Sequence, residues 1–331
     1  MILTIGEVLM RLSADEGSAL AESDKLNIHI GGAEVNVAKG LSQMGVKTGI
    51  YSVVPDNDIG ARALRDIRSA GVEEKWIFKD GDRLGLYFHE EGFSLKPPVV
   101  IYDRKDSSFY RLPENKVKPK ELFEGVSALH VTGITLAINT EVREYVKWLI
   151  RQAKDEGVFV SFDMNYRSKL WSPSEAGAAL KELLPYIDFL FAGEKDFRLL
   201  LQWDAPDLEH KEVLAYYYEK AKREFNIKGA ASTNRIIHDQ NHHSLTGYLF
   251  YESQLMESSK IDFQVKDRIG GGDGFASGIL YGLHNGLAPE ETLNRGMAVG
   301  VYQHFFKGDQ INISENMIQT LSNPVPQDLL R

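Results

Sequence analysis

Short apolar runs that are typical of buried strands alternate along this chain with amphipathic helical patterns. The runs that indicate strands lie at residues 2–5, 50–54, 128–131, 158–163, 189–192 and 227–232. Helical patterns separate several of them, for example at residues 141–156 and 174–184. This order predicts an α/β fold with a mostly parallel sheet covered by helices on both faces. Because ligands of such sheets bind at the carboxyl ends of the strands, polar residues that follow strands are the candidates for function.

One region lacks helices between its strands. Its extended runs lie at residues 26–30, 84–90 and 98–104. The last two flank the turn-rich stretch Glu91-Gly92-Phe93-Ser94 and predict a β-hairpin. We expect the segments around residues 9–30 and 84–112 to form a small sheet that stands off the main one. A lid that excludes water from a cleft is one interpretation of it, and an ordinary edge hairpin is the other.

Composition limits the class of protein. The 331 residues can bury a large core, and no repeat or linker divides them, so we expect a single domain over residues 1–331. A net charge of −9 and a pI near 5.6 argue against nucleic acid or an anionic membrane as a partner. Without cysteine the chain has no disulfide framework and no thiolate metal site. The start lacks the basic region of a signal peptide and no apolar run could span a bilayer, so a cytoplasmic location is expected.

The most informative motif is Asp267-Arg268-Ile269-Gly270-Gly271-Gly272-Asp273-Gly274, which follows an extended run at residues 261–266 and precedes a helical run at 275–283. Glycine backbone at the start of a helix can approach a phosphate closely, and its free N–H groups point at the anion. Asp273 lies at the same helix start, where we expect the helix dipole to keep it ionised and able to take a proton from a hydroxyl. An anion cradle beside a base is what phosphoryl transfer to an alcohol requires. The alternative is a glycine-rich turn with a capping aspartate.

Other polar residues also follow predicted strands. Asn36 lies in the first turn of a helix that begins after Gly31-Gly32, and it can present an amide to a ligand. Asp163-Met164-Asn165-Tyr166-Arg167 directly follows an apolar strand. If Arg167 and Arg104 converge on one pocket, they favour a ligand with a carboxylate or phosphate, because guanidinium binds such groups through paired hydrogen bonds. The alternatives are a solvated asparagine, local capping charges, and for Arg104 a solvated charge on an edge strand.

These motifs together resemble those of the ribokinase-like (PfkB) carbohydrate kinases, over nearly the whole chain. The resemblance implies a ribokinase-like fold with a β lid, Asp273 as catalytic base, and Gly270, Gly271 and Gly272 as an anion hole. Gly271 departs from the alanine of the family pattern. The resemblance also implies ATP and Mg²⁺ as cofactors.

Within this family the chain is most similar to the 2-keto-3-deoxygluconate kinases. That similarity rests on segments around Gly32, Tyr87, Tyr102, Thr132, Asp163 and Lys307. It implies ATP-dependent phosphorylation of 2-keto-3-deoxygluconate to its 6-phosphate. The substrate contacts that it implies come from Gly32, Asn36, Tyr87, Tyr102, Arg104, Ile134, Arg167, Asp273 and Asp309. A fructokinase or other neutral-sugar kinase, and a non-catalytic regulator that binds a sugar acid, are the alternatives.

The nucleotide side matches the family less well. The segment Gly193-Glu194-Lys195-Asp196 replaces the family element that positions Mg²⁺ through water, so Glu194 or Asp196 is expected to serve. Ser232 and Arg235 are expected beside the nucleotide, where Arg235 can supply positive charge. We expect no protein-held metal centre: His238, His242 and His243 indicate a solvated hairpin tip rather than a metal site. A homo-oligomer is expected. The sequence leaves open the epimer and nucleotide preferences and any need for a monovalent cation.

Overall fold

The computed structural model describes residues 1–92, 96–114, 116–309, 311 and 313–322. Within them the main sheet has ten strands in the order β13-β12-β11-β10-β9-β8-β1-β4-β5, with β14 paired to β12. Its strands are β1 (Ile2–Ile5), β4 (Thr48–Val54), β5 (Ile77–Lys79), β8 (Ala128–Thr132), β9 (Phe159–Asp163), β10 (Phe189–Phe191), β11 (Gly229–Ile237), β12 (His242–Tyr251), β13 (Gln254–Glu257) and β14 (Ile261–Gln264). The pairs from β5 to β11 are parallel, and those that involve β12 are antiparallel. The predicted parallel sheet is therefore confirmed.

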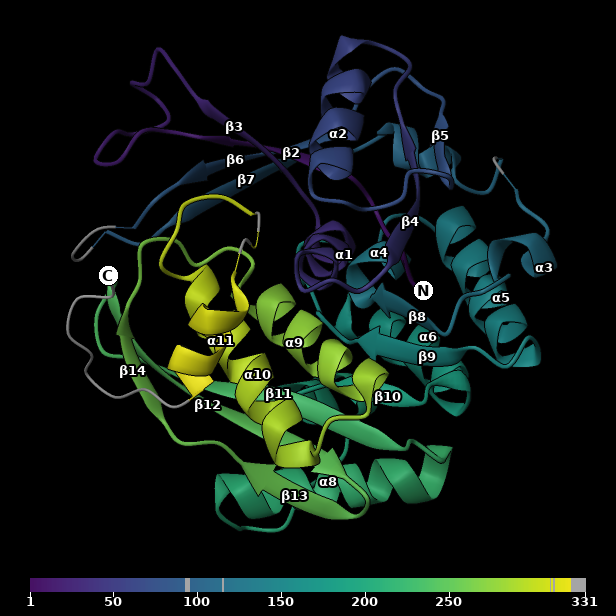
Figure 1. The fold of residues 1–331 in the computed structure, drawn as a ribbon, viewed down its shortest axis with the longest axis vertical. Helices are drawn as coiled ribbons and strands as arrows, with labels where there is room; N and C mark the ends of the chain where they lie inside the picture. The colour runs from purple at the N-terminus through teal and green to yellow at the C-terminus, as the bar shows by residue number, and fades with distance from the viewer. Residues whose placement is uncertain (93–95, 115, 310, 312, 323–331) are drawn as a thin grey trace.

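Helices cover both faces of this sheet (Figure 1). One face carries α1 (Ala33–Gln43), α9 (Gly271–Asn285) and α10 (Pro289–Gln303), with α11 (Glu315–Ser322) packed on α10. The other carries α5 (Thr140–Asp155), α6 (Pro173–Leu183) and α8 (His210–Phe225). The remaining helices are α2 (Asp58–Ser69), α3 (Pro119–Leu122), α4 (Gly133–Leu136) and α7 (Glu194–Asp196). No helix in the described part of the chain combines the length and apolar character needed to cross a membrane.

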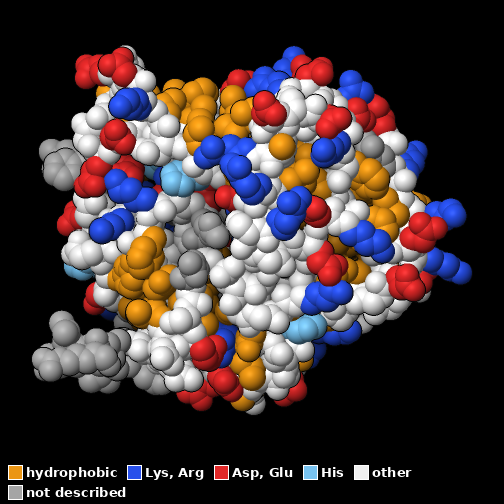
Figure 2. All heavy atoms as spheres, turned by 45° about the horizontal axis from the view of Figure 1, so that its top comes forward, with side chains coloured by type: hydrophobic (Ala, Val, Ile, Leu, Met, Phe, Trp, Pro, Cys, Tyr) orange, Lys and Arg blue, Asp and Glu red, His pale blue; other side chains and the backbone are white. Residues whose placement is uncertain are grey.

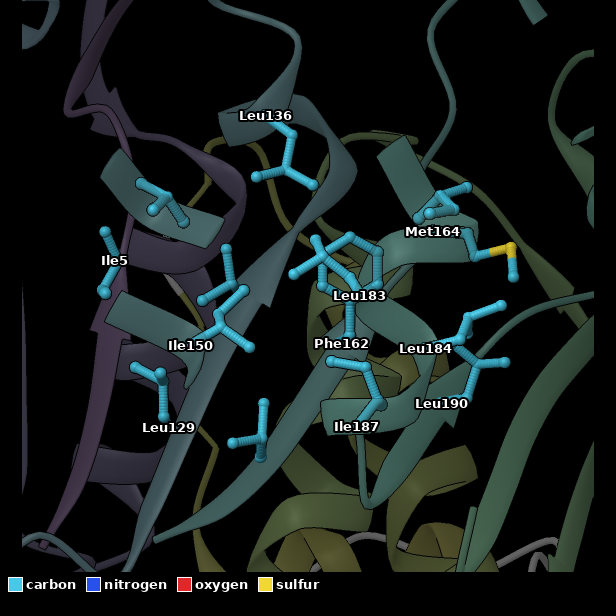
Figure 3. Packing of buried hydrophobic residues seen from close by; sticks show 14 of the residues in the cluster. Ile5, Leu129, Leu136, Ile150, Phe162, Met164, Leu183, Leu184, Ile187 and Leu190 are labelled. Atoms are coloured by element: carbon cyan, nitrogen blue, oxygen red, sulfur yellow. The ribbon is translucent and has the colours of Figure 1, made fainter. Parts of the chain in front are cut away.

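The two largest layers of the core lie on opposite sides of the main sheet. Figure 3 shows the layer beneath α5 and α6, where Ile5, Leu129, Phe162 and Leu190 from neighbouring strands meet Ile150 and Leu183 from the helices. On the opposite side Phe275 and Ile279 of α9 pack against Leu249 of β12 and Met297 of α10. These strands are buried on both faces, which explains their nearly continuous apolar sequences.

A second sheet of four strands lies beside the main one, in the order β3-β2-β6-β7 (Figure 1). Its strands are β2 (Leu9–Ser13), β3 (Asn27–Gly31), β6 (Gly85–Glu90) and β7 (Val99–Asp103). The predicted hairpin is confirmed, because β6 and β7 pair antiparallel with Tyr87 opposite Tyr102. Phe93 and Ser94 of the expected turn lie outside the described residues. We call these four strands the small sheet.

Charged side chains of both signs are interspersed over the face that Figure 2 presents, with apolar patches between them. The net charge of −9 is therefore not gathered into one acidic area on this face. Surfaces of mixed charge favour solubility without steering a partner of one sign.

Candidate active site

Two cavities meet at the carboxyl end of β9. The smaller, which we call the inner cavity, has a volume of about 240 Å³ and lies between the small sheet and the starts of α1 and α9. The larger, the outer cleft, has a volume of about 620 Å³ and lies along β10, β11 and α7. Asp163, Asn165, Arg167 and Gly272 line both of them. A group held in one cavity can therefore face a group held in the other across Gly272.

The inner cavity brings together most of the residues that the sequence singled out. Its wall contains Gly32, Asn36, Tyr87, Tyr102, Arg104, Ile134, Arg167, Gly270, Gly271, Gly272 and Asp273. They come from α1, from both strands of the predicted hairpin, from the segments after β8 and β9, and from the start of α9. Asp309 is the exception, because it lies behind Tyr87 and its carboxylate accepts a hydrogen bond from the Tyr87 hydroxyl at 3.0 Å.

The glycine motif forms the start of α9. Gly270 precedes the helix with a left-handed backbone (φ 81°), and the helix itself begins at Gly271. No side chain caps this end, so the first N–H groups of α9 are available to an anion. Gly271 and Gly272 therefore lie in the first turn together with Asp273, and Gly270 is the residue that precedes the helix.

A close contact that the sequence does not reveal requires glycine at position 271. A Cβ atom at this position would lie 2.1 Å from Cε1 of the His304 imidazole. His304 is fully buried, and its Nδ1 donates to the Gly300 carbonyl at 2.7 Å while its Nε2 accepts from Arg235 at 2.9 Å. An alanine here, as in the family pattern, would collide with this fixed ring.

Asp273 is partly buried and accepts a hydrogen bond from Asn36 Nδ2 at 2.7 Å. Burial raises the pKa of Asp273 to about 7, although Asn36 and Arg167 act in the opposite direction. We expected the helix dipole to keep this carboxylate ionised, whereas burial shifts its pKa in the opposite direction. A carboxylate that titrates near neutral pH suits a general base. The amide of Asn36 is committed to Asp273, and its Oδ1 has no partner among the described residues.

Arg104 is buried rather than solvated, so the interpretation as a solvated edge-strand charge is wrong. Both Nε, at 2.8 Å, and Nη2 of its guanidinium donate to Glu7 Oε2. Ser107 donates to the other oxygen of Glu7. Glu7 lines the inner cavity and was missed by the sequence analysis, because it lies in a loop with no motif around it.

Arg167 differs from Arg104 because it has no acidic partner in the described part of the chain. Its side chain is exposed, and its one recorded hydrogen bond goes to the Tyr166 carbonyl at 3.4 Å. Asp163 lies nearby, and burial together with Asp196 and Asp273 raises the pKa of Asp163 to about 8, against the opposing effect of Arg167. Arg167 is therefore a positive charge without an ion-pair partner among the described residues, and it lies where the two cavities meet.

A second acidic residue of the inner cavity was also missed. Glu34, in the first turn of α1, is buried and accepts hydrogen bonds from the Thr132 amide at 3.0 Å and the Thr135 hydroxyl at 2.7 Å. Burial raises the pKa of Glu34. Its place two residues after Gly32, at the start of the helix, is the one sequence signal that pointed to it.

The outer cleft contains the four residues expected beside a nucleotide: Glu194, Asp196, Ser232 and Arg235. Glu194 is already paired, with Arg198 at 3.0 Å and with His210 at 2.8 Å. Among the described residues Asp196 accepts a hydrogen bond from the Gly193 amide alone, at 2.8 Å, and burial raises its pKa. Asp196 is therefore the more available carboxylate of the two.

Arg235 and Ser232 lie on β11. Burial and the nearby Arg268 lower the pKa of Arg235 to about 10, so it stays charged at neutral pH while His304 orients it. The Ser232 hydroxyl lies 2.8 Å from that of Tyr218, which fixes it at the floor of the cleft.

The three histidines near residue 240 do not all lie at a solvated tip. β11 and β12 form the expected antiparallel hairpin, and His238 is exposed. His243 is fully buried, so the prediction of a solvated position is wrong for it. It follows the turn by two residues, and in a strand alternate side chains point to opposite faces, here into the core. Within the described residues, no group of three or more His, Cys, Asp or Glu is arranged to hold a metal ion.

Comparison with known proteins agrees with this geometry. The family model for pfkB family carbohydrate kinases matches residues 1–315. The 2-dehydro-3-deoxygalactonokinase of Haloferax volcanii is 32% identical over 96% of this chain and 95% of its own, and the 2-dehydro-3-deoxygluconokinase of Bacillus subtilis is 29% identical over 93% and 90%. The crystal structure of the 2-dehydro-3-deoxygluconokinase of Thermotoga maritima superimposes with a TM-score of 0.93 at 30% identity and covers 97% of this chain and 98% of its own. The ribokinase-like fold expected from the sequence is confirmed, and this chain belongs to the pfkB family of carbohydrate kinases.

Proposed function

We propose that this protein transfers the γ-phosphoryl group of ATP to the 6-hydroxyl of 2-keto-3-deoxygluconate, which gives 2-keto-3-deoxy-6-phosphogluconate and ADP. The observation that carries the proposal is the composition of the inner cavity. One wall of it has a carboxylate with a pKa near 7, Asp273, at an uncapped helix start, and another has the unpaired guanidinium of Arg167. The carboxylate of Asp273 and the uncapped helix start serve phosphoryl transfer to an alcohol. The guanidinium of Arg167 serves recognition of an acid.

In the proposed reaction the sugar acid occupies the inner cavity and the nucleotide the outer cleft. The hydroxyl oxygen forms a bond to the γ-phosphorus as the bond from that phosphorus to the β,γ-bridging oxygen breaks. Asp273 accepts the hydroxyl proton, and the N–H groups at Gly270–Gly272 bind the transferring phosphoryl oxygens. Gly272 lines both cavities, which supports this arrangement.

Mg²⁺ would reach the site with the nucleotide. It typically keeps several waters and binds phosphates together with one or two carboxylates. Asp196 fits this role better than Glu194, because its carboxylate has a backbone N–H as its one recorded partner whereas Glu194 is paired with two side chains. The ion supplies neutralisation of β- and γ-phosphate charge.

Arg167 is proposed to bind the substrate carboxylate, with Tyr102 contributing its hydroxyl. Arg104 gives two of its nitrogens to Glu7, and among the described residues Nη1 has no recorded acceptor. A substrate carboxylate at Arg104 would therefore share the guanidinium with Glu7, so the two arginines are not equivalent.

We propose further that the chain works as one unit in which the small sheet is a lid over the inner cavity. Tyr87, Tyr102 and Arg104 reach that cavity from β6, from β7 and from the residue after β7. A sheet that lines the cavity and lies beside the main sheet is suited to excluding water from the transferring phosphoryl group.

The C4 epimer, 2-keto-3-deoxygalactonate, is a second candidate substrate. The relative from Haloferax volcanii that matches at 32% identity bears the name of a galactonate-type kinase. Both epimers carry the carboxylate and the primary alcohol that the proposal requires, so the mechanism is the same for either.

The test is an ADP-release assay with both epimers, fructose and ribose, in wild type, Arg167→Gln and Arg104→Gln. A charge-assisted hydrogen bond contributes about 1.5–3 kcal/mol, so its loss costs roughly one to two decades in kcat/KM. We expect a large ratio of kcat/KM for a sugar acid over fructose, which collapses in Arg167→Gln and falls less in Arg104→Gln.

Preference of the wild type for fructose or ribose would identify a neutral-sugar kinase and would overturn the carboxylate assignment. Binding of a sugar acid without ADP release from ATP would indicate a non-catalytic regulator instead. A rise in the KM for ATP alone in Arg167→Gln would assign this arginine to the nucleotide phosphates.

A further inference from the structure

Arg11 is a fully buried arginine in the middle of β2, 1% exposed, and each of its three guanidinium nitrogens donates at least one hydrogen bond. Nε donates to the Ser13 hydroxyl at 2.7 Å and Nη1 to Asp309 Oδ1 at 3.1 Å. Nη2 donates to Asp267 Oδ2 at 2.5 Å and to His89 Nδ1 at 2.8 Å. Only the planar fork of arginine serves four acceptors in this geometry, and the compact ammonium of lysine does not.

Asp267 connects Arg11 to the anion hole. It is the first residue of the glycine motif, and its Oδ1 accepts a hydrogen bond from the Ile269 amide at 3.0 Å. Its Oδ2 accepts another from the Gly308 amide at 3.1 Å. The carboxylate therefore fixes the backbone immediately before Gly270, and Arg11 fixes the carboxylate.

Asp309 connects Arg11 to the inner cavity. The hydroxyl of Tyr87 lies 3.0 and 3.1 Å from its two oxygens, and Tyr87 lines the cavity while Asp309 does not. In the register of the small sheet, Arg11 is also the partner of Tyr87 on the neighbouring strand. One guanidinium thus holds a side chain of the cavity wall and the loop that leads to the anion hole.

Arg11 balances the charges of the residues that it contacts. Two buried carboxylates, Asp267 and Asp309, face this one cation, and His89 accepts a hydrogen bond from it and so is neutral. Burial lowers the pKa of His89 to about 4, with Arg11 acting in the same direction. Without Arg11, the carboxylates of Asp267 and Asp309 would lose the cation that pairs with them and would stay buried away from water.

We propose that Arg11 is a positioning residue for phosphoryl transfer: it couples the small sheet to the anion hole by holding Asp267 and Asp309 in one fixed arrangement. Arg11 does not line either cavity, so it acts through these two residues and not on the substrate. The expected effects of Arg11 on kcat and KM rest on the proposed function. The expected effect on the backbone around Asp267 rests on the contacts alone.

The first test compares Arg11→Met with the control Arg295→Met. Arg295 is also a buried arginine, but it pairs with Glu315 between α10 and α11 and lines neither cavity. At a temperature where both variants stay folded, we expect kcat to fall roughly 10–100-fold in Arg11→Met, with a higher KM for the sugar. The KM for ATP should change little, and Arg295→Met should keep the wild-type kcat. Arg11→Lys should recover only a small part of the loss.

A purely structural role is distinguished by the triple variant Arg11→Met/Asp267→Asn/Asp309→Asn. It removes the two unpaired charges together with the cation, so the melting temperature should rise above that of Arg11→Met. We expect kcat to remain low, because the loop has lost its anchor. Recovery of kcat to the wild-type value along with stability would overturn the inference.

Hydrogen exchange tests the anchoring without any substrate. The amides of residues 267–274 should exchange faster in Arg11→Met than in wild type and in Arg295→Met. Unchanged exchange in this segment would overturn the inference whatever the enzyme phosphorylates. If the wild type phosphorylates no sugar, the proposed function fails, but the exchange result still decides whether Arg11 anchors the loop.

Discussion

At the scale of single residues, the environment of Asp273 determines how the site can work. Burial raises the pKa of this carboxylate to about 7, and the hydrogen bond from Asn36 limits the rise. A carboxyl group with this pKa is ionised only in part at neutral pH, which suits the proposed role of Asp273 as a general base. Asn36, which we expect to contact the ligand, donates its side-chain N–H to Asp273.

The first prediction concerns this base. Asp273→Asn should keep the fold and substrate binding but lose most of kcat, because an amide cannot accept the hydroxyl proton. In wild type, kcat should rise with pH through about 7, as the carboxylate ionises. Steady-state kinetics between pH 5 and 9 measure both effects. Near-normal turnover of Asp273→Asn would contradict the assignment, and a partial loss would indicate that Asp273 mainly orients the hydroxyl.

The second prediction separates the two carboxylates of the outer cleft. Activity should require Mg²⁺ and disappear with a chelator, because the phosphate charge must be neutralised. Asp196→Ala should raise the Mg²⁺ concentration needed for half-maximal activity by roughly tenfold. Glu194→Ala is the matched control and should change it less, because Glu194 is paired with Arg198 and His210. Full activity without divalent metal would refute the kinase mechanism.

At the scale of elements, the start of α9 and the end of α10 pack closely together, and one of their contacts involves His304. His304 follows the last residue of α10 and occupies the space that a side chain at position 271 would need. Interiors are close-packed, so a single added carbon in such a place displaces its neighbours. The same imidazole orients Arg235 toward the outer cleft, so the packing of two helices also positions a charge.

The third prediction uses this contact. Gly271→Ala should lower the melting temperature, at a cost of about 1–3 kcal/mol for overpacking. Gly272→Ala is the control, since a Cβ there meets no atom within 4 Å. The double variant Gly271→Ala/His304→Ala should be more stable than the sum of the single effects predicts. Thermal unfolding of the four proteins in this cycle measures the coupling, and strict additivity would show that His304 is not the obstacle.

At the scale of the whole molecule, several carboxylates from distant segments meet where the two cavities join. Asp163 is the last residue of β9, and Asp196 and Asp273 of α7 and α9 come close enough to repel its charge, which Arg167 opposes. Burial and this repulsion raise the pKa of Asp163 to about 8. Asp163 therefore keeps its proton in the folded protein between about pH 4 and pH 8, where the unfolded chain releases it, and the contribution of this group to stability falls as pH rises through this range.

The fourth prediction follows from that linkage. Asp163→Asn cannot ionise but keeps an oxygen that can accept from the Asn165 amide, as Asp163 does at 2.9 Å. It should raise the melting temperature at pH 9 by on the order of a few degrees and leave it unchanged at pH 4. Calorimetry at the two pH values measures the difference. Equal effects at both would show that the charge of Asp163 costs the folded state nothing.

The sequence alone determined the parallel sheet, the β6–β7 hairpin and the segments that carry the site. Hydrophobic periodicity and glycine placement report local conformation, and the residue after a strand end must lie at the edge of the sheet. The resemblance to the carbohydrate kinases, rather than strand position alone, led us to expect Asp273, Asn36 and Arg167 at one site, and all three line the inner cavity.

The tertiary structure decided which charges are paired and which are free. Asn36 and Asp273 are 237 positions apart, Arg104 and Glu7 are 97 apart, and Arg11 and Asp267 are 256 apart. Hydrogen bonds over such separations, and the desolvation that raises the pKa of Asp273, depend on how distant segments pack and leave no periodic trace in the sequence. The buried pairing of Arg104, the collision at Gly271 and the cluster around Arg11 follow only from the arrangement of the two sheets and their helices, because each depends on side chains that folding brings together.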